Sequence, residues 1–88
     1  EGLTIALRPR EDCWISLTLD GASEPVVLRT MRAGESAVFE ADNEINLIVG
    51  NPSAFAFTIN QQAGKSFTTG DPVTLNITRQ NYRNFVAP

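Results

Sequence analysis

The chain has 88 residues, of which 42% are hydrophobic and 19% charged, and its formal net charge is −3. It contains no histidine and a single cysteine, which excludes histidine-based catalytic triads, an internal disulfide and the Cys/His ligand sets of zinc sites. The seven basic residues are scattered and form no stripe that could follow a nucleic-acid backbone. No apolar run approaches the roughly 20 residues that span a bilayer, so we expect one small globular domain over residues 1–88.

Alternation of apolar and polar residues predicts two strands at the start of the chain. Residues 3–7 alternate until Pro9, whose ring fixes φ and removes a hydrogen-bond donor, so a loop is expected there. Residues 13–19 alternate most strictly of all. Asp20 and Gly21 follow directly and predict a tight turn.

Two further extended runs occupy residues 26–32 and 36–41. Gly34 lies between them and supports a turn. The first run carries Arg29 and Arg32, charged residues of the kind that protect an exposed sheet edge from aggregation. We therefore predict that residues 26–32 form an edge strand.

The second half of the chain repeats the strand pattern. Residues 43–49 alternate and stop at 50–53, a Gly-Asn-Pro-Ser segment of strong turn formers. Residues 54–60 place large and small apolar side chains on opposite faces, and residues 73–79 form a last strand. The loop between these two strands is expected to include a short extended piece around Phe67.

About seven short strands without a helix-length amphipathic segment indicate an all-β sandwich or barrel. Residues 79–88 form a C-terminal arm in this interpretation. Tyr82 and Phe85 are three residues apart there, so a helical turn or an irregular arm could present both rings on one side.

Trp14 does not fit the strand that contains it. The alternation assigns Cys13 and Ile15 to the core, Cys13 as a small buried residue, and leaves the only tryptophan on the polar face. An exposed tryptophan could anchor an interface or stack on a ligand. Alternatively, the C-terminal arm could cover it with Tyr82 or Phe85, and we predict that the arm does so.

Carboxylates are the only remaining candidates for catalysis or for calcium binding. Glu11 with Asp12, Asp42 with Glu44, and Asp71 all lie at predicted turns or strand ends, where acidic side chains ordinarily face water. We therefore predict no enzymatic activity, no cofactor and no metal.

Several segments in order resemble one family. The segments DCWISLTLDG, RAGES, IVGNPSAFAFTIN and LNITRQNYRNF span most of the chain and together resemble the C-terminal extracytoplasmic domain of RodZ-like bacterial cell-shape proteins. Trp14, Gly34, Gly50 and Asn51 match motif positions of that family. The family has no catalytic residues to carry over.

The resemblance implies an immunoglobulin-like β-sandwich with a scaffolding role near the wall-synthesis machinery. It also implies a longer membrane protein, with a cytoplasmic helix-turn-helix domain that contacts the actin-like cytoskeleton, then a transmembrane helix and a linker. The chain begins on a strand pattern without an initiator methionine, and we expect it to be the piece outside the membrane, in the periplasm of a two-membrane cell.

Two positions depart from the family pattern. Pro52 follows the Gly-Asn turn where a small residue is expected, and Asn60 is not followed by the usual glycine. These differences leave the conformations of both loops open.

The leading functional hypothesis is a non-catalytic module that contacts protein partners of the wall-elongation machinery, with no nucleic acid bound and with membrane attachment only through the missing transmembrane segment. A second hypothesis is a glycan- or peptide-binding sandwich with Trp14 and Tyr82 as stacking platforms. In a third, the open edge at residues 26–32 accepts a strand from a partner or from a second copy.

Overall fold

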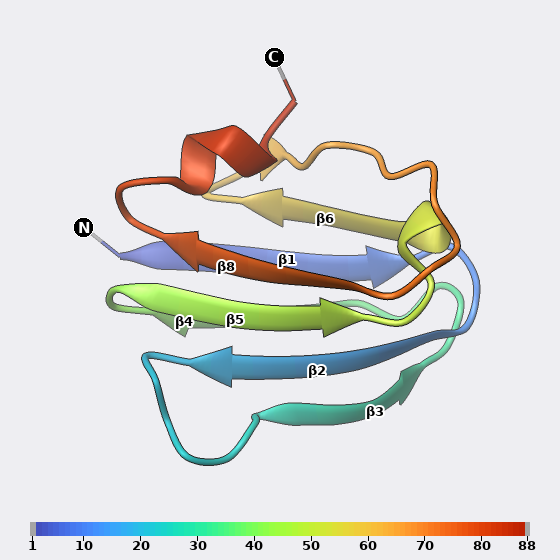
Figure 1. Ribbon diagram of the computed structural model, residues 1–88, viewed down its shortest axis with the longest axis horizontal. Helices are drawn as coiled ribbons and strands as arrows, with labels where there is room; N and C mark the ends of the chain where they lie inside the picture. Colours follow the sequence, from blue (N-terminus) through green and yellow to red (C-terminus); the bar gives the residue numbers. More distant parts are fainter. Residues whose placement is uncertain (1, 88) are drawn as a thin grey trace.

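The computed structural model describes residues 2–87, which form two four-stranded antiparallel sheets packed face to face (Figure 1). The predicted β-sandwich is therefore confirmed. The strands in chain order are β1 (Leu3–Pro9), β2 (Cys13–Leu19), β3 (Val27–Met31), β4 (Ala37–Ala41), β5 (Glu44–Val49), β6 (Phe55–Ile59), β7 (Gln62–Ala63) and β8 (Val73–Thr78). Two short 3₁₀ helices, η1 (Pro52–Ala54) and η2 (Tyr82–Phe85), complete the described elements.

The strand order within each sheet differs from the order in the chain. Sheet A has the order β4-β1-β6-β7, and sheet B has the order β3-β2-β5-β8. In Figure 1 sheet B lies in front and sheet A behind it. Only the β2–β3 and β6–β7 connections stay within one sheet, so every other connection crosses between the layers. Strand β3 lies at the edge of sheet B, as predicted for residues 26–32.

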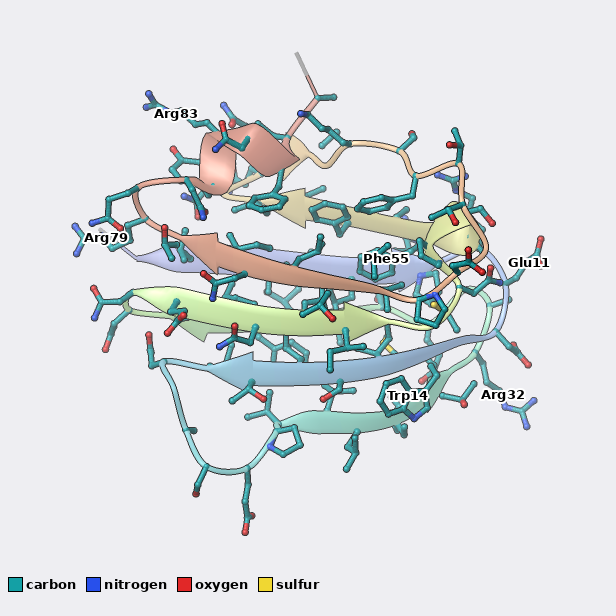
Figure 2. All side chains as sticks on the ribbon, in the orientation of Figure 1. Glu11, Trp14, Arg32, Phe55, Arg79 and Arg83 are labelled. Atoms are coloured by element: carbon teal, nitrogen blue, oxygen red, sulfur yellow. The ribbon has the colours of Figure 1, made fainter. Side chains whose placement is uncertain are left out.

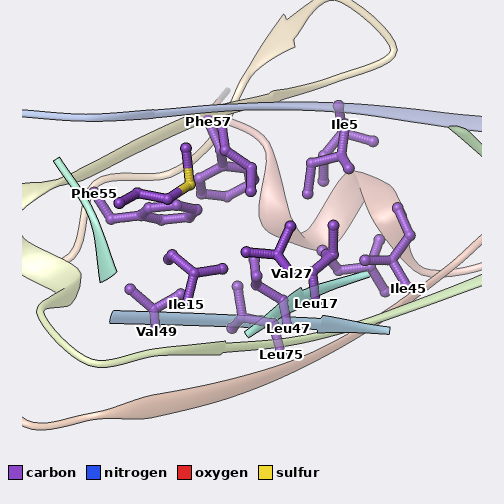
Figure 3. Close-up of a cluster of buried hydrophobic side chains, with 14 of the residues drawn as sticks. Ile5, Ile15, Leu17, Val27, Ile45, Leu47, Val49, Phe55, Phe57 and Leu75 are labelled. Carbon is purple, nitrogen blue, oxygen red and sulfur yellow. The ribbon is translucent and has the colours of Figure 1, made fainter. Parts of the chain in front are cut away.

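The core consists of alternate side chains from the two inner faces. Ile15, Leu17 and Phe57 are among those that fill the space between the sheets (Figure 3). Cys13 is 1% exposed, which confirms its prediction as a core residue, and burial raises the pKa of its thiol. No polar or charged side chain among residues 2–87 is buried, so the contact between the two layers is apolar.

A row of aromatic rings extends the core toward one margin of the sandwich. The ring centroids of Phe55 and Phe57 are 5.3 Å apart, and those of Phe57 and Phe67 are 6.3 Å apart. Phe67 lies outside any strand, and the extra short strand is β7, a few residues earlier than the expected extended piece. A Cβ added to Gly64 would overlap the Phe57 ring, so the ring can pack there only because residue 64 is glycine.

The C-terminal arm closes this same margin. Tyr82 and Phe85 lie in a short helical turn, η2, which is the first of the two arrangements considered for the arm, and both pack against the core together with Val86. After the turn, Val86 forms an antiparallel bridge with Gly64, and the amide of Lys65 donates to the carbonyl of Phe85 at 2.9 Å. Figure 1 shows η2 beside β8 and β6, at the margin farthest from β3. Residue 88 lies outside the described residues.

Asp20 connects two turns that are distant in sequence. Asp20 and Gly21 have φ values of 53° and 67°, in agreement with the predicted tight turn. The Asp20 carboxylate accepts hydrogen bonds from the backbone amides of Asp42, Asn43 and Glu44 at 2.8, 2.7 and 3.1 Å. These bonds, led by those from Asp42 and Asn43, lower the pKa of Asp20.

The β6–β7 hairpin shows what the missing glycine after Asn60 does. Asn60 and Gln61 form its two-residue loop with φ values of 50° and 70°, as a type I′ turn requires. Glycine would adopt this conformation without steric cost, whereas the Cβ of Gln61 makes the left-handed backbone unfavourable. Asn60 is held in place because its side-chain Oδ1 accepts a hydrogen bond from the Thr4 amide at 2.8 Å.

We predict that Gly64→Ala lowers the free energy of unfolding by about 1–3 kcal/mol, the range for overpacking a well-filled site, because the Phe57 ring must move. Urea denaturation followed by Trp fluorescence measures the change. Gly70→Ala is the control, since an added Cβ at residue 70 meets nothing within 4 Å. Equal stability of the two variants would contradict the packing of Phe57 on Gly64.

We predict that Gln61→Gly raises the free energy of unfolding by about 0.5–1 kcal/mol, because it relieves a left-handed backbone at a non-glycine residue. Gln80→Gly serves as the control, because Gln80 lies in a turn without a positive φ. Glycine there relieves no strain and only increases the conformational entropy of the unfolded chain, which lowers stability. Thermal unfolding compares the two, and a destabilised Gln61→Gly variant would refute the strained turn.

Asp20 should also make stability depend on pH. Because folding lowers its pKa, the carboxylate contributes stability above the ordinary aspartate value and loses that contribution as the pH falls below about 4. Asp20→Asn should therefore be less stable at pH 7 and lose less stability on acidification. Asp71→Asn is the control, since the Asp71 carboxylate accepts no hydrogen bond from residues 2–87. Urea titrations at pH 7 and pH 3 test this, and parallel acid losses in wild type and Asp20→Asn would disprove it.

Candidate functional site

Trp14 is exposed, and the prediction that the C-terminal arm covers it is wrong. Its side chain is 41% exposed on the outer face of sheet B, near β3 (Figure 2). The arm, marked by Arg83 in the same view, lies at the opposite margin beside β8. Tyr82 and Phe85 pack there against the core, because the open end of the apolar interior offers their rings more burial than a flat outer face does.

The neighbours of Trp14 explain its exposure. Thr30 lies opposite it on the edge strand β3, and Gly50 follows β5 on the other side. The Gly50 amide donates to the Trp14 carbonyl at 2.8 Å, and a Cβ on residue 50 would lie 3.1 Å from the Trp14 Cβ. Glycine thus permits the close approach of the two backbones, and no side chain stands beside the indole on that flank.

The family motif positions Trp14, Gly50 and Asn51 form one corner of the sandwich. Asn51 precedes η1, and its carbonyl accepts a hydrogen bond from the Ala54 amide at 3.1 Å. Pro52, the first departure from the family pattern, is buried at the first position of η1, where a missing N–H costs nothing.

Gly34, the fourth motif position, belongs to a separate turn. Its φ is 85°, and its amide donates to the carbonyl of Pro9 at 3.1 Å. The next residue, Glu35, forms a two-pronged ion pair with Arg29 at 3.1 and 3.2 Å, and the Arg29 hydrogen bonds are the main cause of the lowered pKa of Glu35. Because this pair is exposed, we assign the turn a structural role only.

Two exposed apolar residues join Trp14 on the outer face of sheet B. Leu28 is 62% exposed and Ile48 is 36% exposed, and both lie opposite Ser16 in the strand register. Each is therefore a diagonal neighbour of Trp14, at about 7–8 Å between backbones. We call Trp14, Leu28 and Ile48 the Trp14 face. Sequence reasoning missed Leu28 and Ile48, although both stand at polar positions of the alternation.

The surroundings of the Trp14 face are mostly polar and uncharged, although the Glu44 carboxylate lies on the same outer face and Arg29 lies between Leu28 and Thr30 on β3. The outward residues nearest to it on the strands are Ser16, Thr18, Thr30, Asn46, Thr74 and Asn76. Asn76 Nδ2 donates to Asn46 Oδ1 at 2.7 Å and to Glu44 Oε2 at 2.6 Å, which connects β8 to β5 on this face. The face is therefore an apolar centre within a hydrogen-bonding rim, the arrangement common in protein interfaces.

The candidate carboxylates do not assemble into a metal site. Within residues 2–87 no group of three or more His, Cys, Asp or Glu side chains is arranged to hold an ion. Over the same residues, no helix is long and apolar enough to cross a bilayer. Two hollows lie away from Trp14: one of about 710 Å³ between β7 and the arm, and one of about 500 Å³ on the outer face of sheet A.

Comparison with known protein families gave a match over most of the chain. The family model described as the RodZ C-terminal domain matches residues 6–85, nearly the whole chain. Searches of the curated proteins and of the solved structures found no match. The matched segment runs from β1 to the end of η2 and so includes every residue of the Trp14 face.

Proposed function

The chain belongs to the family of RodZ C-terminal domains, and on that premise we propose that it docks a bacterial cell-shape protein onto a protein partner through the Trp14 face. The family identifies the chain as a module of cell-shape proteins. The proposed partner is a component of the wall-elongation machinery outside the cytoplasmic membrane. The module itself is non-catalytic in this proposal, and a transmembrane segment elsewhere in the protein anchors it.

The exposed indole on a fixed strand backbone carries this proposal. Tryptophan is enriched among residues that dominate binding energy at interfaces. The Trp14 backbone is fixed on both sides, by pairing with β3 and by the Gly50 hydrogen bond, so a partner would order little more than one side chain. Leu28 and Ile48 widen the apolar contact, and their direct outward partners in the strand register, Ser16 and Thr74, are uncharged.

A protein surface suits this face better than a glycan does. Trp14 lines none of four hollows found among residues 2–87, so a ligand there would meet a sheet surface rather than one of these clefts. Tyr82, the second ring of the glycan hypothesis, is half-buried at the opposite margin with the Arg83 guanidinium 5.7 Å from its ring centroid. Trp14 and Tyr82 therefore cannot serve as one stacking platform.

We predict that Trp14→Ala in the full-length protein abolishes crosslinking of this domain to the wall-elongation proteins. Cells that carry this variant should also lose their normal shape, because that shape depends on the contact. Val38→Ala is the matched control, because Val38 is 63% exposed on the other sheet. The isolated Trp14→Ala domain should lose no more than about 2 kcal/mol of stability, less than the 3–5 kcal/mol typical of a buried aromatic ring.

Two results would overturn the proposal. One is full crosslinking and normal shape with Trp14→Ala in a folded protein. The other is a saturable change in Trp14 fluorescence on titration with soluble wall glycan fragments, together with crosslinking that does not depend on Trp14. A loss with Trp14→Ala but not with Val38→Ala supports the docking role.

A further inference from the structure

The outer face of sheet A, on the far side from Trp14, contains a cleft of about 500 Å³. Its floor is made of small side chains on two neighbouring strands, β1 and β6. Ala6 lies opposite Thr58, and Ala56 lies opposite Arg8. The centre of the sheet surface is therefore recessed, because longer side chains surround these small ones. The volume of the cleft is in the range typical of ligand clefts.

Basic residues from separate parts of the chain surround this floor. Arg8 and Arg10 come from the end of β1 and the residue after it, and Lys65 comes from the segment after β7. The hydroxyl residues Ser36 and Ser66 also line the cleft. We call this site the basic cleft.

The charge of the basic cleft is unbalanced. Its lining contains three cations and no Asp or Glu, although the chain as a whole has a net charge of −3. The only ion pair within residues 2–87 joins Arg29 to Glu35, so Arg8, Arg10 and Lys65 have no carboxylate partner there. All three side chains are exposed and can reach a ligand.

The backbones that carry these cations are anchored. The Arg10 amide donates to the Ala54 carbonyl at 2.7 Å, and the Lys65 amide donates to the Phe85 carbonyl at 2.9 Å. Arg8 is paired within β1 to β6. The backbones thus hold the three cations at fixed positions on both sides of the floor. This arrangement favours binding of a ligand whose acidic groups have a matching separation, rather than equal attraction of any anion.

We infer that the basic cleft binds an acidic peptide segment. One carboxylate pairs with the guanidinium groups of Arg8 and Arg10, whose planar donors match a carboxylate in two-pronged fashion, and a second carboxylate pairs with Lys65. The floor of Ala6, Ala56 and Thr58 leaves room for the peptide backbone between them. This site lies on the opposite outer face from the Trp14 face, so it is separate from the docking role proposed above.

The test is a titration of the domain with the acetylated, amidated peptide Glu-Ala-Glu-Ala-Glu, followed by NMR amide shifts and calorimetry. We expect saturable binding with shifts at residues of the basic cleft. The double variant Arg8→Gln/Lys65→Gln should weaken binding by about three- to tenfold, because exposed ion pairs are individually weak. The control Arg32→Gln/Arg79→Gln removes the same charge from other margins (Figure 2) and should bind like the wild type.

Several outcomes would overturn the inference. One is that a peptide with glutamine in place of each glutamate binds as tightly as the acidic peptide. Another is that the control variant weakens binding as much as Arg8→Gln/Lys65→Gln does. A third is that inorganic phosphate binds as tightly as the peptide, which would indicate general attraction of anions. Absence of saturable binding would also overturn it. Trp14→Ala should leave peptide binding unchanged, so failure of this inference and failure of the docking proposal are distinguishable.

Discussion

The two sheets bury alternate side chains of most strands against each other, and the rest of the molecule depends on this apolar contact. No buried polar side chain among residues 2–87 fixes the register or adds specificity, so the register depends on shape and alternation. Glycine stands where a side chain would collide, as Gly64 does under the Phe57 ring. The outward positions are consequently free of a packing role, and their residues can differ between the two faces without cost to the core.

The margins of the sandwich explain why the arm does not cover Trp14. A sandwich is closed on its faces but open where its edge strands end, and an open end exposes apolar core to water. Phe67, Tyr82 and Phe85 close one such end in this chain. Their rings are thereby used for stability, which leaves Trp14 as the large ring available on the outer face of sheet B.

The two outer faces consequently have different chemistry. Sheet B presents the Trp14 face, which is apolar at its centre and mostly polar and uncharged around it. Sheet A presents a floor of small residues with Arg8, Arg10 and Lys65 around it. The two proposed sites lie on opposite outer faces, so neither shares residues with the other.

Alternation along single strands determined the all-β class, the burial of Cys13 and the outward position of Trp14, because the two-residue period of a strand is a local property. The turn at Asp20 and the edge position of β3 also followed from local residue types. The tertiary structure alone decided the rest. Strand order could not be read from sequence, because most connections cross between the layers, and so the grouping of Trp14 with Leu28 and Ile48 emerged only from the register. Arg8 and Lys65 meet around one floor for the same reason: long-range pairing, which no local pattern encodes, places β1 and β6 side by side.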